Sequence, residues 1–453
     1  MAYDKVVDSA SLDSKLTQVA DAIRTKGNTS ADLQFPSGFI SAIQAIQTGT
    51  ELQIIVTVKS GATVTATKGS LSVSGTSVDG TCTLTVPEAG TWSVKATHNG
   101  QTSDTKSVTF TDRYTTSLSF FSATITVTVE SGASVTLKKG GTTIATKTSN
   151  GTAVFTVTET GAYTVTATKN GQTPSGSVNV VSSTTSYALT LYIANSTLNN
   201  NEWSAIKFFS DAVQGANYWS VGDRKAVTLN GTVGALTLSN FTTYAFIIGF
   251  NHNASVEGAN RIHFQLGKTA LSGGTDVALC DSYYTDNTNG GFCMNASGTS
   301  SGGWKSSQMR TNICGTSLSS YSGTIIGVIP AALRAILKSV TKYTDNTGGG
   351  SGNVASYVTA TTDYFFLLSE FEVFGSITIG NTNEKNKQAQ YAYYSAGNSK
   401  IKYKHNGTST AAAWRLRSPY ANASGFFVIV NTDGTDGGAG AGFSRGFAPG
   451  FCV

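Results

Sequence analysis

Histidine is the residue that most often supports acid–base catalysis, and this sequence contains few. The four histidines are His98, His252, His263 and His405, and their spacing matches no metal-ligand motif. A hydrolase needs a nucleophile beside a base, or a pair of acids, and no nucleophile–base motif is present. We therefore predict a binding protein and not an enzyme.

Cysteine chemistry is equally restricted. The five cysteines are Cys82, Cys280, Cys293, Cys314 and Cys452. Their number is odd and none belongs to a Cys-x-x-Cys pair, a pattern that predicts neither a disulfide framework nor a zinc site. We expect free thiols, with a single bridge within the last domain as the alternative.

Two pairs of charged residues have a spacing that could place them together. Glu370 and Glu372 lie two residues apart, as do Arg415 and Arg417. On strands, each pair would point to one face, and two adjacent carboxylates need a cation or must share a proton. We interpret the four residues as a structural network between neighbouring strands. A Ca²⁺ site and an acid/base pair remain alternatives.

Two oxygen-rich loops, at residues 286–290 and 345–348, have a composition like that of calcium loops. Both lack the spaced acids and the closing glutamate of an EF-hand loop. The same residues are typical of ordinary turns. We therefore predict no cofactor, while a structural Ca²⁺ remains open.

Tyrosine and asparagine are dense near the C-terminus, and such side chains stack on ligands and hydrogen-bond to them. Residues 412–418, 425–430 and 442–453 read as strands separated by small polar loops, an arrangement suited to recognition. A plain polar edge hairpin is the alternative for residues 391–405. The predicted ligand-binding residues are Tyr393, Tyr394, Asn398, Tyr403, His405, Tyr420, Asn422, Asn431, Asp433 and Ser444.

Composition indicates a β-rich chain. Only 13% of the 453 residues are charged, and 49 are glycines. The net charge of +5 comes without a basic run, so nucleic-acid binding has little support. The sequence contains neither an apolar signal region at its start nor an apolar run long enough for membrane insertion. A virion component released by lysis would satisfy both features.

Residues 1–50 are predicted to form a helical segment. Leu12, Leu16, Val19 and Ile23 recur at spacings of four, three and four, which places them on one helix face. Two short helices are too small to be stable alone. The segment is therefore expected to attach to a larger particle or to a sister subunit, with a simple cap on the next domain as the alternative.

An internal repeat follows. Residues 60–69 and 85–102 match residues 131–140 and 156–173, both with an offset of 71. The alternating pattern and the Asn-Gly dipeptides predict strands joined by hairpins. Residues 51–112 and 121–181 are therefore expected to form two Ig-like β-sandwiches, which resemble the spacer repeats of surface proteins and phage fibres.

The last domain is expected at 188–453, after a polar linker at 182–187. A helix is predicted near residues 330–340, where four apolar residues share a face. These residues are Leu333, Ile336, Leu337 and Val340.

Several motifs of this domain resemble an uncharacterised domain that is common in prophage tail and surface proteins of Firmicutes. They include Trp203-Ser-Ala-Ile206, Gly222-Asp223 after Tyr218, Ile247-Ile-Gly-Phe250, Gly303-Trp304 with Met309-Arg310, Leu367-Leu-Ser-Glu370, Trp414-Arg-Leu-Arg-Ser-Pro419 and Pro449-Gly-Phe-Cys-Val453. Residues 19–27 and 35–39 likewise resemble the start of many phage tail proteins.

The domain is also similar to the C-type-lectin-like fold, which is shared with formylglycine-generating enzymes and with receptor-binding proteins varied by diversity-generating retroelements. The resemblance implies a ligand surface on the last strands and loops, and assembly as trimers. The calcium triplets of true C-type lectins are absent, as is a counterpart of the catalytic cysteine pair.

Together these features predict a mainly β, modular protein with a C-terminal α+β C-type-lectin-like domain. The expected function is that of a phage tail receptor-binding protein, a homotrimer located on the virion. It would join other tail proteins through its N-terminus and bind a host surface glycan or protein. A bacterial cell-surface adhesin is one alternative, and a polysaccharide-modifying enzyme on the same scaffold is a second.

Overall fold

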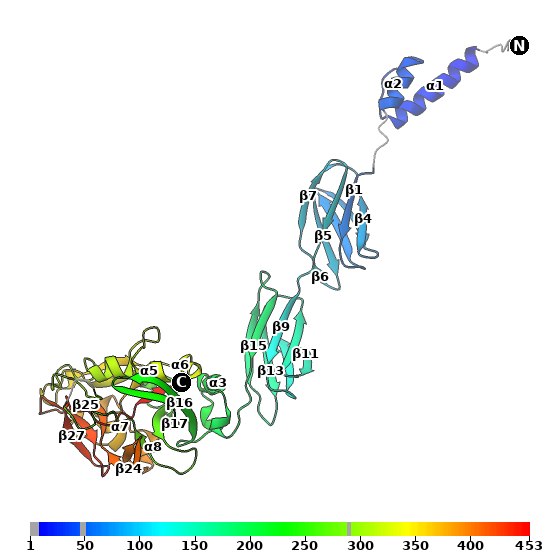
Figure 1. Cartoon of the computed structure of the whole chain (residues 1–453). Coiled ribbons are helices and arrows are strands. Elements are labelled where there is room, and N and C mark those ends of the chain that lie inside the picture. Colours follow the sequence, from blue (N-terminus) through cyan, green and yellow to red (C-terminus); the bar gives the residue numbers. More distant parts are fainter. Residues whose placement is uncertain (1–8, 46–50, 288–290) are drawn as a thin grey trace. The chain divides into compact units, whose positions relative to one another are not determined.

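The computed structural model describes residues 9–45, 51–287 and 291–453. The chain divides into two compact units, Met1–Leu191 and Tyr192–Val453, both labelled by element in Figure 1. Unit 1 contains a helical segment and two β-sandwiches, and unit 2 is an α+β domain. The predicted mainly β, modular fold is confirmed. Within the described ranges, no helix has the length and apolar character required to cross a bilayer.

The helical segment consists of α1 (Ser9–Lys26) and α2 (Ser37–Ala45). Only Ala20, Ile23 and Phe39 are buried between them. The predicted apolar face of α1 is only partly covered, since Leu12 and Val19 are 45% and 48% exposed. This core is too small to stabilise the segment alone.

The two sandwiches have equivalent sheets, as the repeat predicts. In the first, β4-β1-β8 face β3-β2-β5-β6, and β7 also pairs with β5. In the second, β12-β9-β15 face β11-β10-β13-β14. The strands of the first are β1 (Gln53–Thr57), β2 (Thr63–Lys68), β3 (Leu71–Thr76), β4 (Thr81–Thr85), β5 (Gly90–His98), β6 (Gln101–Thr102), β7 (Lys106–Phe110) and β8 (Arg113–Ser117). Those of the second are β9 (Ala123–Thr128), β10 (Ser134–Lys139), β11 (Thr142–Thr148), β12 (Thr152–Val157), β13 (Gly161–Thr168), β14 (Ser175–Val180) and β15 (Ser186–Thr190).

One aromatic side chain anchors each sandwich core in the same way. Trp92 and Tyr163, 71 residues apart, are buried in equivalent strands. The indole N–H of Trp92 donates to the carbonyl oxygen of Glu88, and the hydroxyl of Tyr163 donates to that of Glu159. A buried polar group needs such a hydrogen-bond partner. In both sandwiches the partner is the backbone carbonyl of the glutamate four residues earlier in the chain.

Each sandwich extends past its predicted end. β8 pairs in parallel with β1, and β15 pairs in parallel with β9. β15 thus includes part of the predicted linker at 182–187 and the predicted start of the last domain at 188. Its only large apolar side chains, Tyr187 and Leu189, are half-buried, so its short alternation is a weak signal of a strand in the sequence.

Unit 2 is built around a five-stranded sheet in the order β16-β17-β18-β28-β22. Three small sheets surround it: β19-β23-β24, β20-β21 and β25-β26-β27. The strands are β16 (Arg224–Val233), β17 (Leu236–Phe250), β18 (Ile262–Lys268), β19 (Val277–Ala278), β20 (Val340–Asp345), β21 (Val358–Asp363), β22 (Phe365–Phe366), β23 (Lys402–Lys404), β24 (Gly407–Ala412), β25 (Trp414–Pro419), β26 (Phe426–Val430), β27 (Asp436–Gly440) and β28 (Gly450–Cys452).

The helices of unit 2 are short. The α-helices are α3 (Trp203–Asp211), α4 (Ala254–Glu257), α5 (Ile325–Val328), α6 (Ala331–Arg334), α7 (Glu370–Phe374) and α8 (Ala392–Ser395). The other helical turns are η1 (Leu198–Asn200), η2 (Gly215–Asn217), η3 (Met309–Cys314), η4 (Ala355–Tyr357) and η5 (Thr382–Asn386). The helix predicted at 330–340 is only the single turn α6. The four apolar residues of that prediction are buried as expected, but Val340 already begins β20.

Replacing Trp92 with alanine should destabilise the first sandwich by about 3–5 kcal/mol, because a fully buried ring is lost from its core. Hydrogen exchange measured by mass spectrometry should show faster exchange across residues 53–117. The exchange of residues 123–190 should stay unchanged. Ser93→Ala, on the exposed side of the same strand, is the matched control, and an equal effect of both substitutions would contradict the prediction.

Candidate functional site

An exposed aromatic surface lies on the sheet β25-β26-β27. Phe426, at the start of β26, is 43% exposed, and its ring centroid lies 5.6 Å from that of Tyr420. Phe443, just past β27, is 36% exposed. We call Tyr420, Phe426 and Phe443 the aromatic face.

Glycines in β27 make room for these rings. A Cβ atom on Gly438 would lie 2.0 Å from the hydroxyl oxygen of Tyr420, and one on Gly440 would lie 3.0 Å from the ring of Phe443. Gly440 is the cross-strand partner of Phe426, so the three rings share one face of the sheet. The glycine-rich stretch predicted as a loop at 431–440 therefore contains a strand that the rings cover.

Arg415 fixes this face from the interior. Its guanidinium donates to the carbonyl oxygens of Ala439 (3.0 Å), Gly440 (2.6 Å) and Phe443 (2.5 Å). Arg415 is fully buried, forms no ion pair among the described residues, and burial lowers its pKa to about 9. A buried arginine bonded to three carbonyl oxygens determines where β27 and Phe443 lie.

A second buried network lies at the other end of β25. Arg417 donates to both oxygens of Glu372, at 2.5 and 2.8 Å. The ammonium of Lys342 lies 2.9 Å from Glu372 and 2.6 Å from Glu257. Burial alone would raise the pKa of Glu372, but Arg417 and Lys342 hold it well below its usual range.

The predicted four-residue network is therefore only partly correct. Glu372 pairs with Arg417, but Glu370 accepts backbone N–H groups of residues 378–380 and Arg415 bonds to carbonyls. The prediction that Glu370 and Glu372 lie on a strand was wrong, because they begin helix α7. Ser369 and Glu372 form a capping box there. The Ser-x-x-Glu pattern was the available sequence signal.

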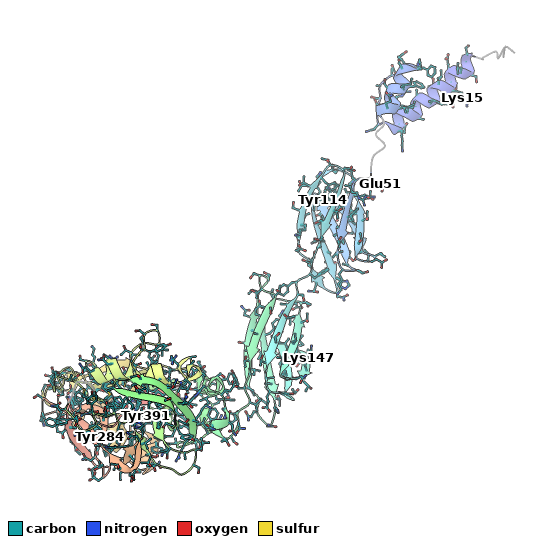
Figure 2. All side chains as sticks on the ribbon, viewed as in Figure 1. Lys15, Glu51, Tyr114, Lys147, Tyr284 and Tyr391 are labelled. Atoms are coloured by element: carbon teal, nitrogen blue, oxygen red, sulfur yellow. The ribbon has the colours of Figure 1, made fainter. Side chains whose placement is uncertain are left out.

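The histidines His252 and His263 lie beside this network and not at the surface. The ring of His252 stacks on Tyr391 with centroids 3.8 Å apart, and His263 Nδ1 lies 3.1 Å from the Tyr391 hydroxyl. Burial lowers the pKa of His252 to about 3. Figure 2 labels Tyr391 within unit 2. Burial also lowers the pKa of His263 well below its usual range, so both imidazole rings are neutral at physiological pH.

The ligand atoms of His252, Glu257 and Glu372 lie within 4.8 Å of one another, close enough for a metal ion. The ammonium of Lys342 already contacts both carboxylates, however. With Arg417, two cations balance two carboxylates. The cluster therefore fits a self-contained ion network better than a metal site.

Three of the predicted ligand-binding residues are buried, so they cannot contribute to a binding surface. Tyr393 accepts from Lys268 at 2.7 Å, Tyr394 donates to Gln265 at 2.6 Å, and Ser444 donates to Asp281 at 3.0 Å. The short helix α8 turns both tyrosines into the core. Tyrosine density alone did not reveal that orientation.

The remaining predicted residues do not form one cluster. Asn398, Asn422 and Asp433 are exposed, and Tyr403, His405, Tyr420 and Asn431 are half-buried. Asn422 precedes β26 and Asn431 follows it, so the two lie at opposite ends of that strand.

Several of these polar side chains also hold loops in place. His405 Nδ1 accepts from the backbone N–H of Cys280 at 3.1 Å. Asp433 accepts from Thr435, and Asn398 donates to the carbonyl of Tyr393. The prediction missed Phe426, which lies in the apolar run 426–430, and Phe443, which follows the glycine-rich stretch.

Of the two loops with calcium-like composition, the 345–348 loop is an ordinary turn. Asp345 is buried and accepts from the backbone N–H groups of Thr347 and Gly348 and from Asn381, as in an ordinary turn. The last three residues of the 286–290 loop lie outside the described residues. All five cysteines fall within the described part of the chain. All are free, as predicted, and all are also buried.

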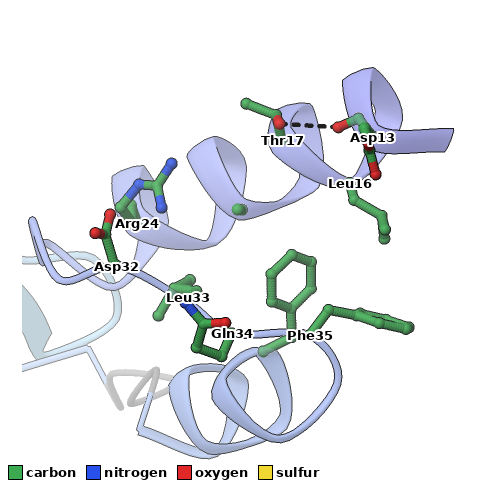
Figure 3. A pocket seen from close by; sticks show the side chains of 10 residues that line it. Asp13, Leu16, Thr17, Arg24, Asp32, Leu33, Gln34 and Phe35 are labelled. Atoms are coloured by element: carbon green, nitrogen blue, oxygen red, sulfur yellow. Dashed lines mark hydrogen bonds between the residues drawn. The ribbon is translucent and has the colours of Figure 1, made fainter. Parts of the chain in front are cut away.

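A separate pocket of about 360 Å³ lies between α1 and α2 in the helical segment (Figure 3). Leu16, Leu33 and Phe35 supply apolar walls, and Asp13 and Arg24 supply charge. Phe35 is 63% exposed at its edge.

The buried carboxyl of Glu384 predicts a pH dependence of stability. Burial raises its pKa from 4.5 to about 7. Between these values the folded state holds a proton that the unfolded state has released, so the free energy of unfolding of unit 2 should fall as pH rises, by roughly 1.4 kcal/mol per unit of pKa difference.

Glu384→Gln mimics the protonated carboxyl and should flatten this dependence. Melting temperatures at pH 5 and pH 8 should differ less for the variant than for the unaltered protein. An unchanged difference would show that Glu384 does not titrate in this range.

Comparison with known proteins supplies no function for the chain. A family model described as a domain of unknown function (DUF6273) matches residues 284–453, the part of unit 2 that carries the aromatic face. The search of curated proteins found no match. Similar solved structures include GBS52, the minor pilin of Streptococcus agalactiae, at 11% identity and a TM-score of 0.21 over 32% of this chain and 97% of that chain. They also include BcpA, the major pilin subunit of Bacillus cereus, at 14% identity and a TM-score of 0.16 over 30% of this chain and 57% of that chain. At these TM-scores, neither likeness carries an argument about function.

Proposed function

We propose that the protein is a phage tail receptor-binding protein whose aromatic face contacts a molecule on the host cell surface. The observation that carries the proposal is the pair of exposed rings, Phe426 and Phe443, which lie with half-buried Tyr420 over a glycine-rich strand. Buried Arg415 holds the backbone of that strand. A contiguous exposed apolar patch is a mark of a binding surface. Tyr420 adds a hydroxyl to the two phenylalanine rings.

Burial of the reactive side chains favours binding over catalysis. Cys452 lies 3.3 Å from His263, a nucleophile–base geometry, but both side chains are fully buried. Burial raises the pKa of Cys452 to about 12, which keeps the thiol protonated and a poor nucleophile. Turnover of host polysaccharide by the protein would instead favour the enzyme alternative.

The phage assignment and the C-type-lectin-like assignment of unit 2 both rest on sequence resemblance. A bacterial cell-surface adhesin with the same modules is the alternative. Tail genes beside the gene for this protein would support the phage assignment.

The helical segment would attach the protein to the tail and hold three copies together. Exposed apolar residues on α1 and α2 support this role, because they need a partner that one copy does not supply. Several weak sites on one particle raise avidity by about 10²–10⁴. The aromatic face of a single copy therefore needs only a low affinity for the receptor. The receptor-binding units would then act together.

Replacing Phe426 and Phe443 with serine should reduce binding to host cells at least about tenfold, since each ring loses its apolar contact with the receptor. Fluorescently labelled full-length protein can be assayed on a panel of Firmicutes strains. Ile144→Ser with Val154→Ser removes two exposed apolar residues from the second sandwich and is the matched control. Equal binding of the two variants, or binding of the unaltered protein to no strain, would contradict the proposal.

Replacing Leu12 and Val19 with glutamate should dissociate the proposed trimer, because like charges would face one another where the α1 helices of the three copies pack together. Light scattering should then report a molar mass about one third of that of the unaltered protein. Ser14→Glu with Thr25→Glu places the same charges on roughly the opposite side of α1, at about 100° per residue. A monomeric unaltered protein would refute self-association through this segment.

A further inference from the structure

We infer that the end of the aromatic face at Phe443 binds an anionic glycan, with Arg445 and Lys404 holding its negative group. The inference rests on the proposed function and specifies its ligand. Neither cation was among the residues predicted from the sequence.

The two cations lie beside aromatic rings at this end of the face. The Arg445 guanidinium lies 5.4 Å from the ring centroid of Phe443, and the Lys404 ammonium lies 4.4 Å from that of Tyr284. Tyr284 pairs with Ser444, the residue between Phe443 and Arg445, so both cations approach the same short segment. Figure 2 labels Tyr284 in unit 2.

Neither cation is neutralised by a carboxylate of the described residues. Within the part of the chain that the structure describes, Arg445 and Lys404 form no ion pair, whereas Lys268, Arg310 and Lys338 each have a carboxylate partner. Among the described residues, the guanidinium of Arg445 donates only to the carbonyl oxygen of Ser444, at 2.9 Å. Half-buried cations without a carboxylate partner are complementary to an anion.

The acidic residues of the neighbouring loop, Asp281 and Asp286, form no ion pair with either cation among the described residues. Asp281 is buried, and its Oδ1 accepts from Ser444 and from the backbone N–H of Tyr283. Asp286 is exposed and forms no ion pair among the described residues. The positive charge of the two cations is therefore available to a ligand.

The mixture of rings and cations indicates a sugar that carries charge. Tyr283 is 37% exposed beside Tyr284, and Phe443 is exposed beside Arg445. Apolar faces of sugar rings pack on aromatic rings, while a planar guanidinium pairs with a carboxylate through two hydrogen bonds. A neutral glycan would leave the cations unused, and a polyanion without rings would leave the aromatic side chains unused.

Binding of full-length protein to acidic glycans tests the inference. Polygalacturonate, hyaluronate and alginate are the probes, measured by calorimetry at low and high salt. Methyl-esterified polygalacturonate keeps the ring but removes the charge, and polyglutamate keeps the charge but removes the ring. We expect at least one acidic glycan to bind at least about tenfold more tightly than both controls, and more weakly at high salt.

Lys404→Gln with Arg445→Gln should weaken that binding at least about tenfold, because both charged contacts are lost. Lys305→Gln with Lys385→Gln removes the same charge from exposed positions elsewhere in unit 2 and should leave binding unchanged. Matching melting temperatures would show that both double variants fold.

Three results would overturn the inference: binding of none of the acidic glycans, equal binding of the methyl ester, or equal binding of polyglutamate. The host-cell assay separates this failure from that of the proposed function. If the Lys404/Arg445 variant binds host cells normally while the Phe426/Phe443 variant does not, the receptor-binding function stands and the anionic ligand does not.

Discussion

The ion pair between Arg417 and Glu372 is the contact on which unit 2 depends most. It joins β25 to α7, and Lys342 adds β20 and α4 through Glu372 and Glu257. Removing water from such charges is costly, and removal of one partner typically costs about 3–5 kcal/mol. The network therefore fixes where β25 lies in the core, and the rest of that small sheet follows from it.

β25 links this buried network to the aromatic face. Arg417 is held by carboxylates in the interior, and two residues earlier Arg415 holds the backbone of β27 and Phe443. The aromatic face is consequently supported by β25, which Arg415 and Arg417 fix at two positions. Rigid support of this kind lowers the entropy lost on binding, because the rings are already placed before a ligand arrives.

Sequence patterns predicted the parts of the fold in which local and long-range signals agree. The alternation around Trp92 and Tyr163 repeats at one offset, so both sandwiches could be predicted. β15 could not, because its residues are never fully buried and its pairing with β9 depends on a partner some 60 residues away. Glu370 and Glu372 were assigned to a strand because a one-turn helix has no periodicity to detect. At the site, Phe426 and Phe427 are adjacent apolar residues, and only the three-dimensional structure shows that the first is exposed.

The position of β28 in its sheet has a consequence for synthesis. This strand comes from residues 450–452 but lies between β18 and β22. A nascent chain can complete both sandwiches early, since the strands of each sandwich pair only with strands of the same sandwich, and domains generally fold in order from the N-terminus. The central sheet of unit 2 cannot be completed until β28 has been synthesised. Until then β18 has an unpaired edge, which is open to pairing with strands of other chains.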